Sequence, residues 1–124
     1  MKRIILVVLF IFILCLWRCI TKKHNNYLHT DKFNDKYYIE EYSYGIMNNL
    51  SAEYFTDSTN FRIYSGHYDD ENEFIYYRID KDSLIVEKLG YKKGYGYGQG
   101  QENIEVKTKK VYSLMYLKNK HIFQ

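Results

Sequence analysis

The amino-acid sequence predicts a mainly β fold of the α+β class. We expect an antiparallel sheet of five or six strands with a short C-terminal helix, preceded by an N-terminal hydrophobic membrane helix. Three observations predict this. The long apolar run lies near the N-terminus, over residues 4–17. The chain has one alanine and no proline but 15 tyrosines, a composition that favours strands over helices. Short β-prone segments also alternate with turn-forming clusters.

Residues 1–23 have the layout of a membrane anchor or signal segment. A basic start precedes fourteen uncharged residues, Ile4 to Trp17, and basic residues resume at Arg18. Fourteen helical residues span only about 21 Å. If Arg18 extends toward the headgroups, residues 4–21 span about 27 Å, enough for a thin bilayer. We therefore expect membrane anchoring through residues 4–21, with the following domain exported to the periplasm or the outer face of the membrane.

Three fates of this segment stay open. A retained single-span signal anchor fits the residues best. Cleavage as a signal peptide requires small residues before the cut, whereas this run ends in bulky ones. A lipoprotein signal would be modified at Cys15 or Cys19, but Leu14 and Arg18 precede these cysteines where that signal has a small residue. The positive charges before and after the apolar run are nearly balanced, so they leave the orientation open.

The clearest unit of secondary structure is a hairpin over residues 73–89. Two β-prone segments flank the turn-forming residues 80–83. Symmetric closure pairs Ile79 with Leu84 and Tyr77 with Val86, and places Ile75 opposite Lys88. The face with Ile75, Tyr77, Ile79, Leu84 and Val86 is then the core face.

The other elements follow from weaker patterns. Residues 24–35 are polar and predicted as a linker, so the globular domain covers residues 36–124. A strand is expected over residues 36–44. Two further strand segments, residues 54–55 and 61–64, flank a turn at residues 57–60, and alternation predicts a half-buried strand over residues 104–109. Residues 66–72 are predicted as a turn. Ser113 is a suitable cap for a short helix that ends near His121.

A segment rich in glycine and tyrosine, residues 90–100, is the candidate ligand-binding loop. It lacks the Gly-Lys-Ser/Thr sequence and the following helix that a phosphate-binding loop requires. We expect a long loop between strands. The alternative is a recognition loop in which Tyr91, Tyr95 and Tyr97 stack on sugar rings beside Lys92 and Lys93.

We predict no catalytic residues, no metal site and no cofactor. The four histidines lack the spacing of metal ligands, and neither cysteine lies in the predicted domain. Ser58, His67 and Asp69 supply the residue types of a hydrolytic triad, but no Gly-x-Ser-x-Gly motif marks the serine. A small hydrolase is therefore the least favoured function.

The basic character of the chain resides in its leader. Residues 1–23 carry five basic and no acidic side chains, whereas residues 24–124 carry 13 basic and 15 acidic ones. The net charge of +3 thus gives no reason to expect nucleic-acid binding by the domain. Residues 31–87 are acidic and residues 88–124 basic, so these segments neutralise each other or present two signs of charge to a protein partner.

Residues 68–75, running into residues 80–86, resemble small uncharacterised exported proteins and lipoproteins of bacteria, as do residues 111–114. The resemblance implies a location at the cell envelope and no particular activity. We therefore expect a membrane-anchored protein whose β-rich domain binds a macromolecular partner without catalysis. Another envelope protein is the expected partner, in an immunity-type or accessory role. A cell-wall or glycan-binding module that uses the loop at residues 90–100 is the alternative.

Overall fold

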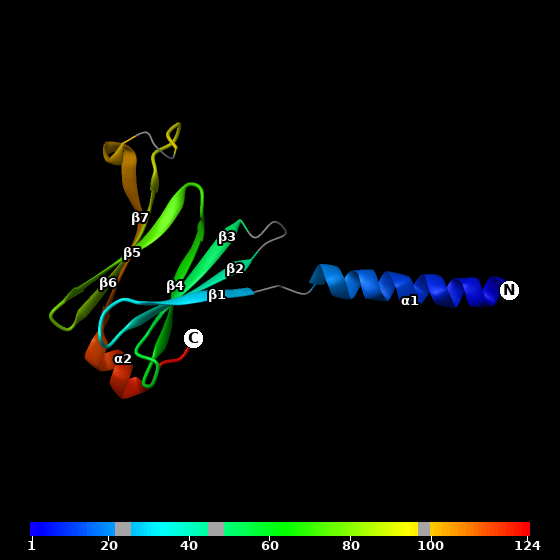
Figure 1. Ribbon diagram of the computed structural model, residues 1–124, viewed down its shortest axis with the longest axis horizontal. Helices are drawn as coiled ribbons and strands as arrows, with labels where there is room; N and C mark the ends of the chain where they lie inside the picture. The colour runs from blue at the N-terminus through cyan, green and yellow to red at the C-terminus, as the bar shows by residue number, and fades with distance from the viewer. Residues whose placement is uncertain (22–25, 45–48, 97–99) are drawn as a thin grey trace.

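The computed structural model describes residues 1–21, 26–44, 49–96 and 100–124, and these residues are mainly β (Figure 1). The elements, in chain order, are α1 (Lys2–Thr21), β1 (Asn26–Lys32), β2 (Tyr38–Tyr44), β3 (Leu50–Thr56), β4 (Arg62–Asp69), β5 (Glu73–Asp80), β6 (Ser83–Tyr91), the 3₁₀ helix η1 (Gln101–Asn103), β7 (Ile104–Ser113) and α2 (Leu114–Lys120).

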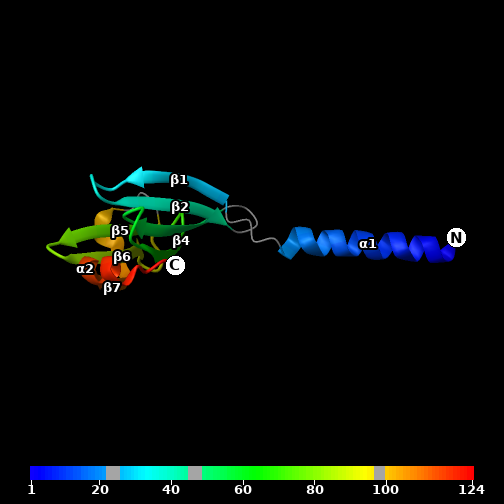
Figure 2. The same cartoon turned by 90° about the horizontal axis from the view of Figure 1, so that it is seen from below.

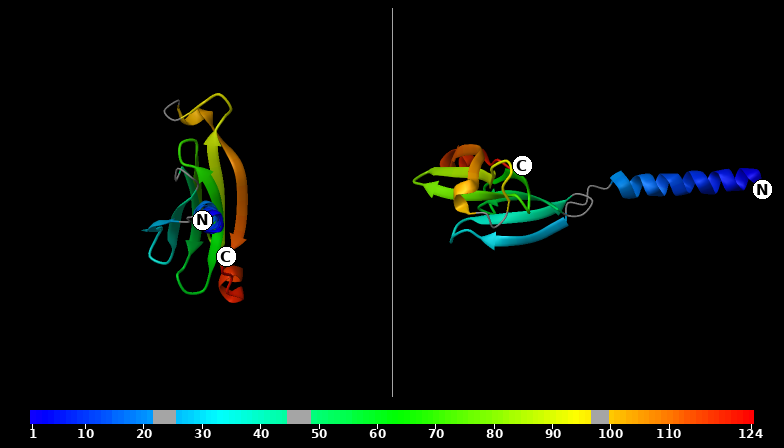
Figure 3. Two further views of the ribbon diagram at one scale, coloured as in Figure 1. Left: turned by 90° about the vertical axis from the view of Figure 1, so that its right-hand side faces the viewer. Right: turned by 90° about the horizontal axis from the view of Figure 1, so that it is seen from above.

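The strands form two antiparallel sheets, so the prediction of one sheet with five or six strands is wrong. Sheet A has the order β1-β2-β3-β4 and sheet B the order β5-β6-β7. Figure 2 and the right-hand view of Figure 3 show β1 and β2 on one side of the domain and sheet B on the other. The division arises because β4 and β5 follow each other without pairing. A tight turn, in which the Asn72 N–H donates to the Asp69 carbonyl at 3.0 Å, leads the chain from sheet A to sheet B.

The predicted hairpin is confirmed as β5 and β6. Ile79 pairs with Leu84 and Tyr77 with Val86, and the turn residue Lys81 takes the left-handed conformation with φ of 55°. Tyr77, Leu84 and Val86 are buried, as expected for the core face. The register follows from the alternation of apolar side chains, because a slip of one residue would turn this face toward solvent.

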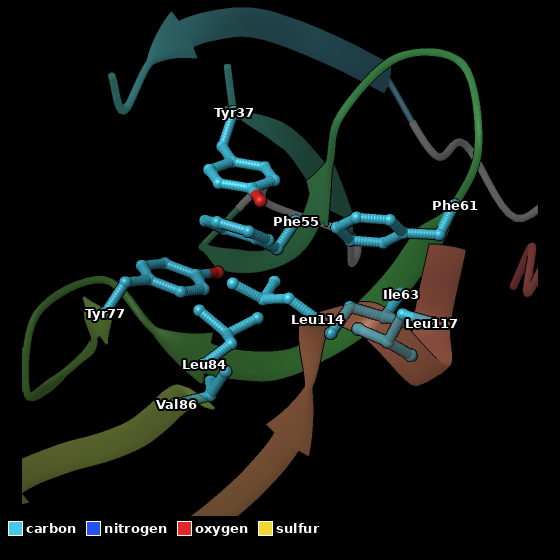
Figure 4. Close-up of a cluster of buried hydrophobic side chains, with 9 residues drawn as sticks. All are labelled: Tyr37, Phe55, Phe61, Ile63, Tyr77, Leu84, Val86, Leu114 and Leu117. Atoms are coloured by element: carbon cyan, nitrogen blue, oxygen red, sulfur yellow. The ribbon is translucent and has the colours of Figure 1, made fainter. Parts of the chain in front are cut away.

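The core lies between the sheets and is closed by α2. Figure 4 shows the rings of Tyr37, Phe55 and Tyr77 in successive layers. The Phe55 centroid lies 5.3 Å from each of the other two. Leu114 and Leu117 of α2 fill one end of this cluster. The helix is capped as predicted: Ser113 Oγ accepts from the Tyr116 N–H, and His121 ends the helix in the left-handed conformation.

Three segments differ from their predicted conformations. β1 lies inside the segment expected to be a linker, where it pairs with β2 through backbone hydrogen bonds that the polar side chains do not signal. Residues 66–69 continue β4 instead of forming a turn. β7 is more exposed than its alternation predicted, and the Val106 side chain is 53% exposed, because β7 is an edge strand.

The prediction of an N-terminal membrane helix is wrong. α1 spans Lys2–Thr21 and stands clear of the sheets (Figure 1), but none of the helices among the described residues is long and apolar enough to cross a membrane. Its uncharged run, Ile4–Trp17, covers only about 21 Å of a hydrocarbon layer that is about 30 Å thick. The same finding contradicts the transmembrane signal anchor and the membrane location with an exported domain that were inferred from residues 4–21.

Candidate functional site

A row of tyrosine rings crosses the face of sheet A that points away from the core. Each strand contributes one ring, and we call Tyr27, Tyr42, Tyr54 and Tyr64 the tyrosine ladder. The ring centroids lie 5.5 Å apart between Tyr27 and Tyr42, 5.5 Å between Tyr42 and Tyr54, and 5.4 Å between Tyr54 and Tyr64. The planes of neighbouring rings are inclined by 58–78°, an arrangement close to edge-to-face that aromatic pairs prefer.

The alternation of strand residues puts these tyrosines on the outer face. On β3, Phe55 and Glu53 point into the core, so Tyr54 between them points outward. Tyr42 on β2 is opposite Ala52, the neighbour of Glu53, and Tyr64 on β4 is opposite Tyr54. We call the outer face of sheet A, with the ladder and the side chains of Glu40, Arg62 and His67, the tyrosine face.

Arg62 holds the middle of the ladder in place. Its guanidinium carbon lies 3.5 Å from the Tyr54 ring centroid and 5.6 Å from that of Tyr42, both within cation–π range. Arg62 Nε donates to Glu40 Oε2 at 2.7 Å, and Nη2 donates to the Tyr42 hydroxyl at 3.2 Å. The positive charge of Arg62 is therefore neutralised within the face.

The Tyr64 end of the ladder carries a hydroxyl–imidazole contact. The Tyr64 hydroxyl lies 2.9 Å from His67 Nδ1, and the His67 ring packs against Tyr44 with centroids 6.3 Å apart. Burial raises the pKa of Tyr64 and Tyr44, so both hydroxyls stay protonated at neutral pH. This end therefore offers two protonated hydroxyls for hydrogen bonding.

The C-terminal residues occupy the free edge of β4 beside the ladder. The Arg62 N–H donates to the Ile122 carbonyl at 2.8 Å, and the Gln124 N–H donates to the Arg62 carbonyl at 2.9 Å. The Tyr64 N–H donates to Gln124 Oε1 at 2.9 Å. These bonds satisfy edge groups of β4 next to the ladder and fix the backbone of Arg62 and Tyr64.

The opposite face of sheet A contains a buried carboxyl group. Glu53 is 9% exposed, and it accepts hydrogen bonds from the Tyr68 hydroxyl at 2.8 Å and the Tyr77 hydroxyl at 2.7 Å. Burial raises the pKa of Glu53; the two hydroxyl donors lower it, and the charges of Glu41 and Asp31 raise it further. Both carboxyl oxygens are engaged inside the protein, so this group joins the two sheets.

A more exposed polar group adjoins Glu53 on β1 and β2. His29 Nε2 lies 3.1 Å from Asp31 Oδ2 and 3.3 Å from Glu41 Oε2, and the Ser51 hydroxyl donates to Glu41 Oε1 at 3.1 Å. Within the described residues, no group of three or more His, Cys, Asp or Glu side chains is placed to hold a metal ion.

The predicted recognition loop is only partly described. Tyr91 ends β6, Lys92 and Lys93 are exposed, Tyr95 is 50% exposed, and Tyr97 lies outside the described residues. The Lys92 N–H donates to the Asn103 carbonyl at 2.7 Å and its Nζ to the Glu102 carbonyl at 3.1 Å. These bonds close the base of the loop, and glycan binding by its tyrosines stays a prediction.

The remaining predicted site residues are not brought together. Cys15 is an exposed free thiol on α1, and the side chain of Cys19 lies outside the described residues. Ser58 lies in the turn before β4, while His67 lies near the far end of that strand, more than about 15 Å of extended chain away. The predicted charge neutralisation is present in sheet B, where Lys88 pairs with Glu73 at 3.0 Å and Lys109 with Glu87 at 3.3 Å.

The sequence did not single out the tyrosine ladder, although it contained a signal. Tyrosines lie at positions 38, 42, 44, 54 and 64, and Tyr54 is followed by the apolar Phe55. That pattern predicts aromatic outer positions on β2, β3 and β4. It does not predict that the four strands align their tyrosines in one row, because the row depends on strand pairing.

Comparison with protein-family models, curated proteins and solved structures gives no match for this chain. The resemblance to small exported proteins and lipoproteins therefore stays a prediction. The geometry of the tyrosine face is the observation from which a function can be inferred.

Proposed function

We propose that this chain is a non-catalytic binding module that recognises a macromolecular partner through the tyrosine face. The observation that carries the proposal is the tyrosine ladder, a continuous aromatic row on an open sheet face. Tyr27, at the edge of sheet A, is 55% exposed and accessible to a partner. Tyr and Arg are the residue types most enriched at the energetic centres of binding interfaces.

The rigidity of the face supports this proposal. Each ladder ring is held by its neighbours, Arg62 is fixed by Glu40 and Tyr42, and the backbone of β4 is fixed by the C-terminal residues. A tyrosine has few rotatable bonds, and here much of that freedom is already lost before binding. Binding to a preorganised surface incurs a smaller entropic penalty than binding to flexible side chains.

The polar groups nearby support a role in binding instead of catalysis. The raised pKa of Glu53 would suit an acid catalyst, but both its oxygens face Tyr68 and Tyr77 inside the protein. On the tyrosine face, the His67 ring is paired with the Tyr64 hydroxyl and Glu40 with Arg62. These pairs shape the surface and hold its side chains in position.

Site-specific photo-crosslinking in the native host tests the proposal. A photoreactive phenylalanine derivative replaces Tyr27 or, in a second variant, Tyr64, and Tyr76 serves as the matched control because it is a half-exposed tyrosine on sheet B. We expect irradiation to give an adduct with a protein or a polysaccharide from positions 27 and 64 and none from position 76. Equal adducts from the three positions, or none from positions 27 and 64, would overturn the proposal.

A further inference from the structure

We infer that the partner of the tyrosine face is an uncharged polysaccharide. The inference rests on the proposed function and names the chemistry of its ligand. Three features of the face carry it: its charge, the spacing of its rings and the arrangement of its polar groups.

The charge of the face matches a neutral ligand. Arg62 is the cationic group among the ladder rings, and Glu40 lies 2.7 Å from its Nε. Farther along β1, Lys32 pairs with Asp35 at 2.8 Å. A polyanion such as a nucleic acid or an acidic polysaccharide needs unpaired cations to replace its counterions. Here Arg62 and Lys32 are already paired, so these two described cations are not free to replace the counterions of a polyanion, and an uncharged ligand does not require them to be.

The spacing of the rings matches a chain of sugar rings. Successive ladder centroids are 5.4–5.5 Å apart across four strands, a distance close to the length of one pyranose unit in an extended chain. Each sugar of a polysaccharide laid across the strands therefore meets a new ladder position, with Arg62 lying over the ring at the Tyr54 position. The face of an aromatic ring carries the negative part of its quadrupole, so it is the part of each ring that attracts the C–H groups of a sugar.

The polar groups are placed along the same row. The hydroxyls of Tyr42 and Tyr64 lie beside Arg62 and His67 respectively, so each aromatic surface has hydrogen-bonding groups at its margin. A sugar presents C–H groups on the faces of its ring and hydroxyls around the edge. An apolar surface bordered by hydroxyls and by a charge-paired guanidinium is complementary to that distribution.

A protein partner would use the same residue types, because Tyr and Arg are enriched at the centres of protein interfaces. The buried centre of such an interface is, however, fully desolvated and more apolar than the rest of the protein surface. On the tyrosine face, β3 contributes the aliphatic side chains of Leu50 and Ala52. The ladder residues themselves all carry hydroxyl groups. We therefore favour the polysaccharide, and the test below separates the two.

Native affinity electrophoresis of the full chain tests this inference. The gels contain hydroxyethylcellulose, mixed-linkage β-glucan or xylan as neutral polysaccharides, and polygalacturonate as an anionic one. We expect at least one neutral polysaccharide to retard the protein and polygalacturonate to have no effect. Replacing both Tyr42 and Tyr64 with alanine should weaken binding about tenfold, whereas Tyr76→Ala should leave it unchanged.

The single variant Tyr27→Ala decides the outcome if the double variant does not fold, since Tyr27 is exposed on an edge strand. It should weaken binding about threefold. Retardation by none of the neutral polysaccharides, or equal retardation of the ladder variants and Tyr76→Ala, would overturn the inference. If photo-crosslinking at Tyr27 then yields a discrete protein adduct, the proposed function stands with a protein partner. If it yields none, both fail.

Discussion

Glu53 is a buried residue whose hydrogen bonds link the two sheets. It comes from β3 in sheet A and accepts hydrogen bonds from Tyr68 in sheet A and Tyr77 in sheet B. A buried ionised carboxylate is tolerated only when donors compensate for its lost hydration. Two hydroxyls compensate in part, so burial still raises the pKa of Glu53.

This raised pKa predicts how stability depends on pH. A carboxyl group whose pKa is higher in the folded than in the unfolded state binds its proton more tightly when folded. Its contribution to stability is complete below the unfolded pKa and is lost as the pH rises through the folded pKa. We expect the unfolding free energy of the wild type, relative to Glu53→Gln, to fall over this window. Urea unfolding at a series of pH values measures it.

Glu53→Gln is a suitable reference because the amide keeps the size of the protonated side chain and does not titrate. Its carbonyl can accept from one tyrosine hydroxyl and its NH₂ can donate to the other. Glu41→Gln is the control, since that side chain is more exposed and bonds to His29 and Ser51. A constant difference between the wild type and Glu53→Gln at all pH values would contradict the prediction.

Phe55 tests the packing of the core at the same scale. It is fully buried, and its ring contacts those of Tyr37, Phe61 and Tyr77. Phe55→Ala should lower the unfolding free energy by about 3–5 kcal/mol, because it removes a large apolar surface and leaves a cavity. Phe74, which is 39% exposed on sheet B, is the control, and its replacement by alanine should cost about 1 kcal/mol or less. Comparable losses in chemical unfolding would show that Phe55 is not at the centre of the core.

At the scale of elements, the turn between β5 and β6 also caps the N-terminus of α2. The Leu114 N–H donates to the Asp82 carbonyl at 2.8 Å, and the Met115 N–H donates to Asp82 Oδ1 at 3.0 Å. The Ser113 hydroxyl donates to Asp82 Oδ2 at 2.6 Å and accepts from the Tyr116 N–H at 3.2 Å. Asp82 therefore satisfies N–H groups at the start of a helix that lies 31 residues or more along the chain.

Loss of this cap should destabilise the protein. Asp82→Ala should reduce the unfolding free energy by about 1–2 kcal/mol, since it removes the carboxylate that bonds the Met115 N–H and the Ser113 hydroxyl. Asp80→Ala, two residues earlier and exposed, should change it by less than about 0.5 kcal/mol. Guanidinium unfolding of both variants provides the comparison. An equal loss of unfolding free energy in the two variants would contradict a capping role of Asp82, because Asp80 does not bond the N-terminus of α2.

Local elements could be predicted well because their signals are local. The β5–β6 register follows from alternating apolar residues and the turn at Lys81, and α2 follows from its Ser113 cap. β1 could not be predicted in this way, because its polar side chains show no alternation and its pairing partner β2 supplies the stabilisation. β4 was predicted too short for a related reason. Its last residues, up to Asp69, are held by β3.

At the scale of the whole molecule, the two-sheet arrangement and the tyrosine ladder could not be predicted. Consecutive antiparallel strands usually pair, and nothing local shows that β4 and β5 do not. The ladder depends on the same pairing, since a tyrosine at one strand position meets another only when the strands are in register. The N-terminal prediction failed for a different reason, because a basic start and an apolar run are compatible with a helix that is not long and apolar enough to cross a membrane.

The junction of the two sheets depends on Tyr77, which makes the last prediction one about the whole molecule. The Tyr77 ring stacks on Phe55 with centroids 5.3 Å apart and its hydroxyl donates to Glu53, so it crosses from sheet B to sheet A. Tyr77→Phe keeps the ring but leaves Glu53 with one donor, and should lower the unfolding free energy by about 1–3 kcal/mol.

Tyr68→Phe removes the other donor to the same carboxyl group from within sheet A, so it is the matched control. Amide hydrogen exchange should show faster opening of both sheets in Tyr77→Phe, whereas Tyr68→Phe should act mainly on β3 and β4. Identical exchange patterns in the two variants would contradict a special role of Tyr77 in joining the sheets.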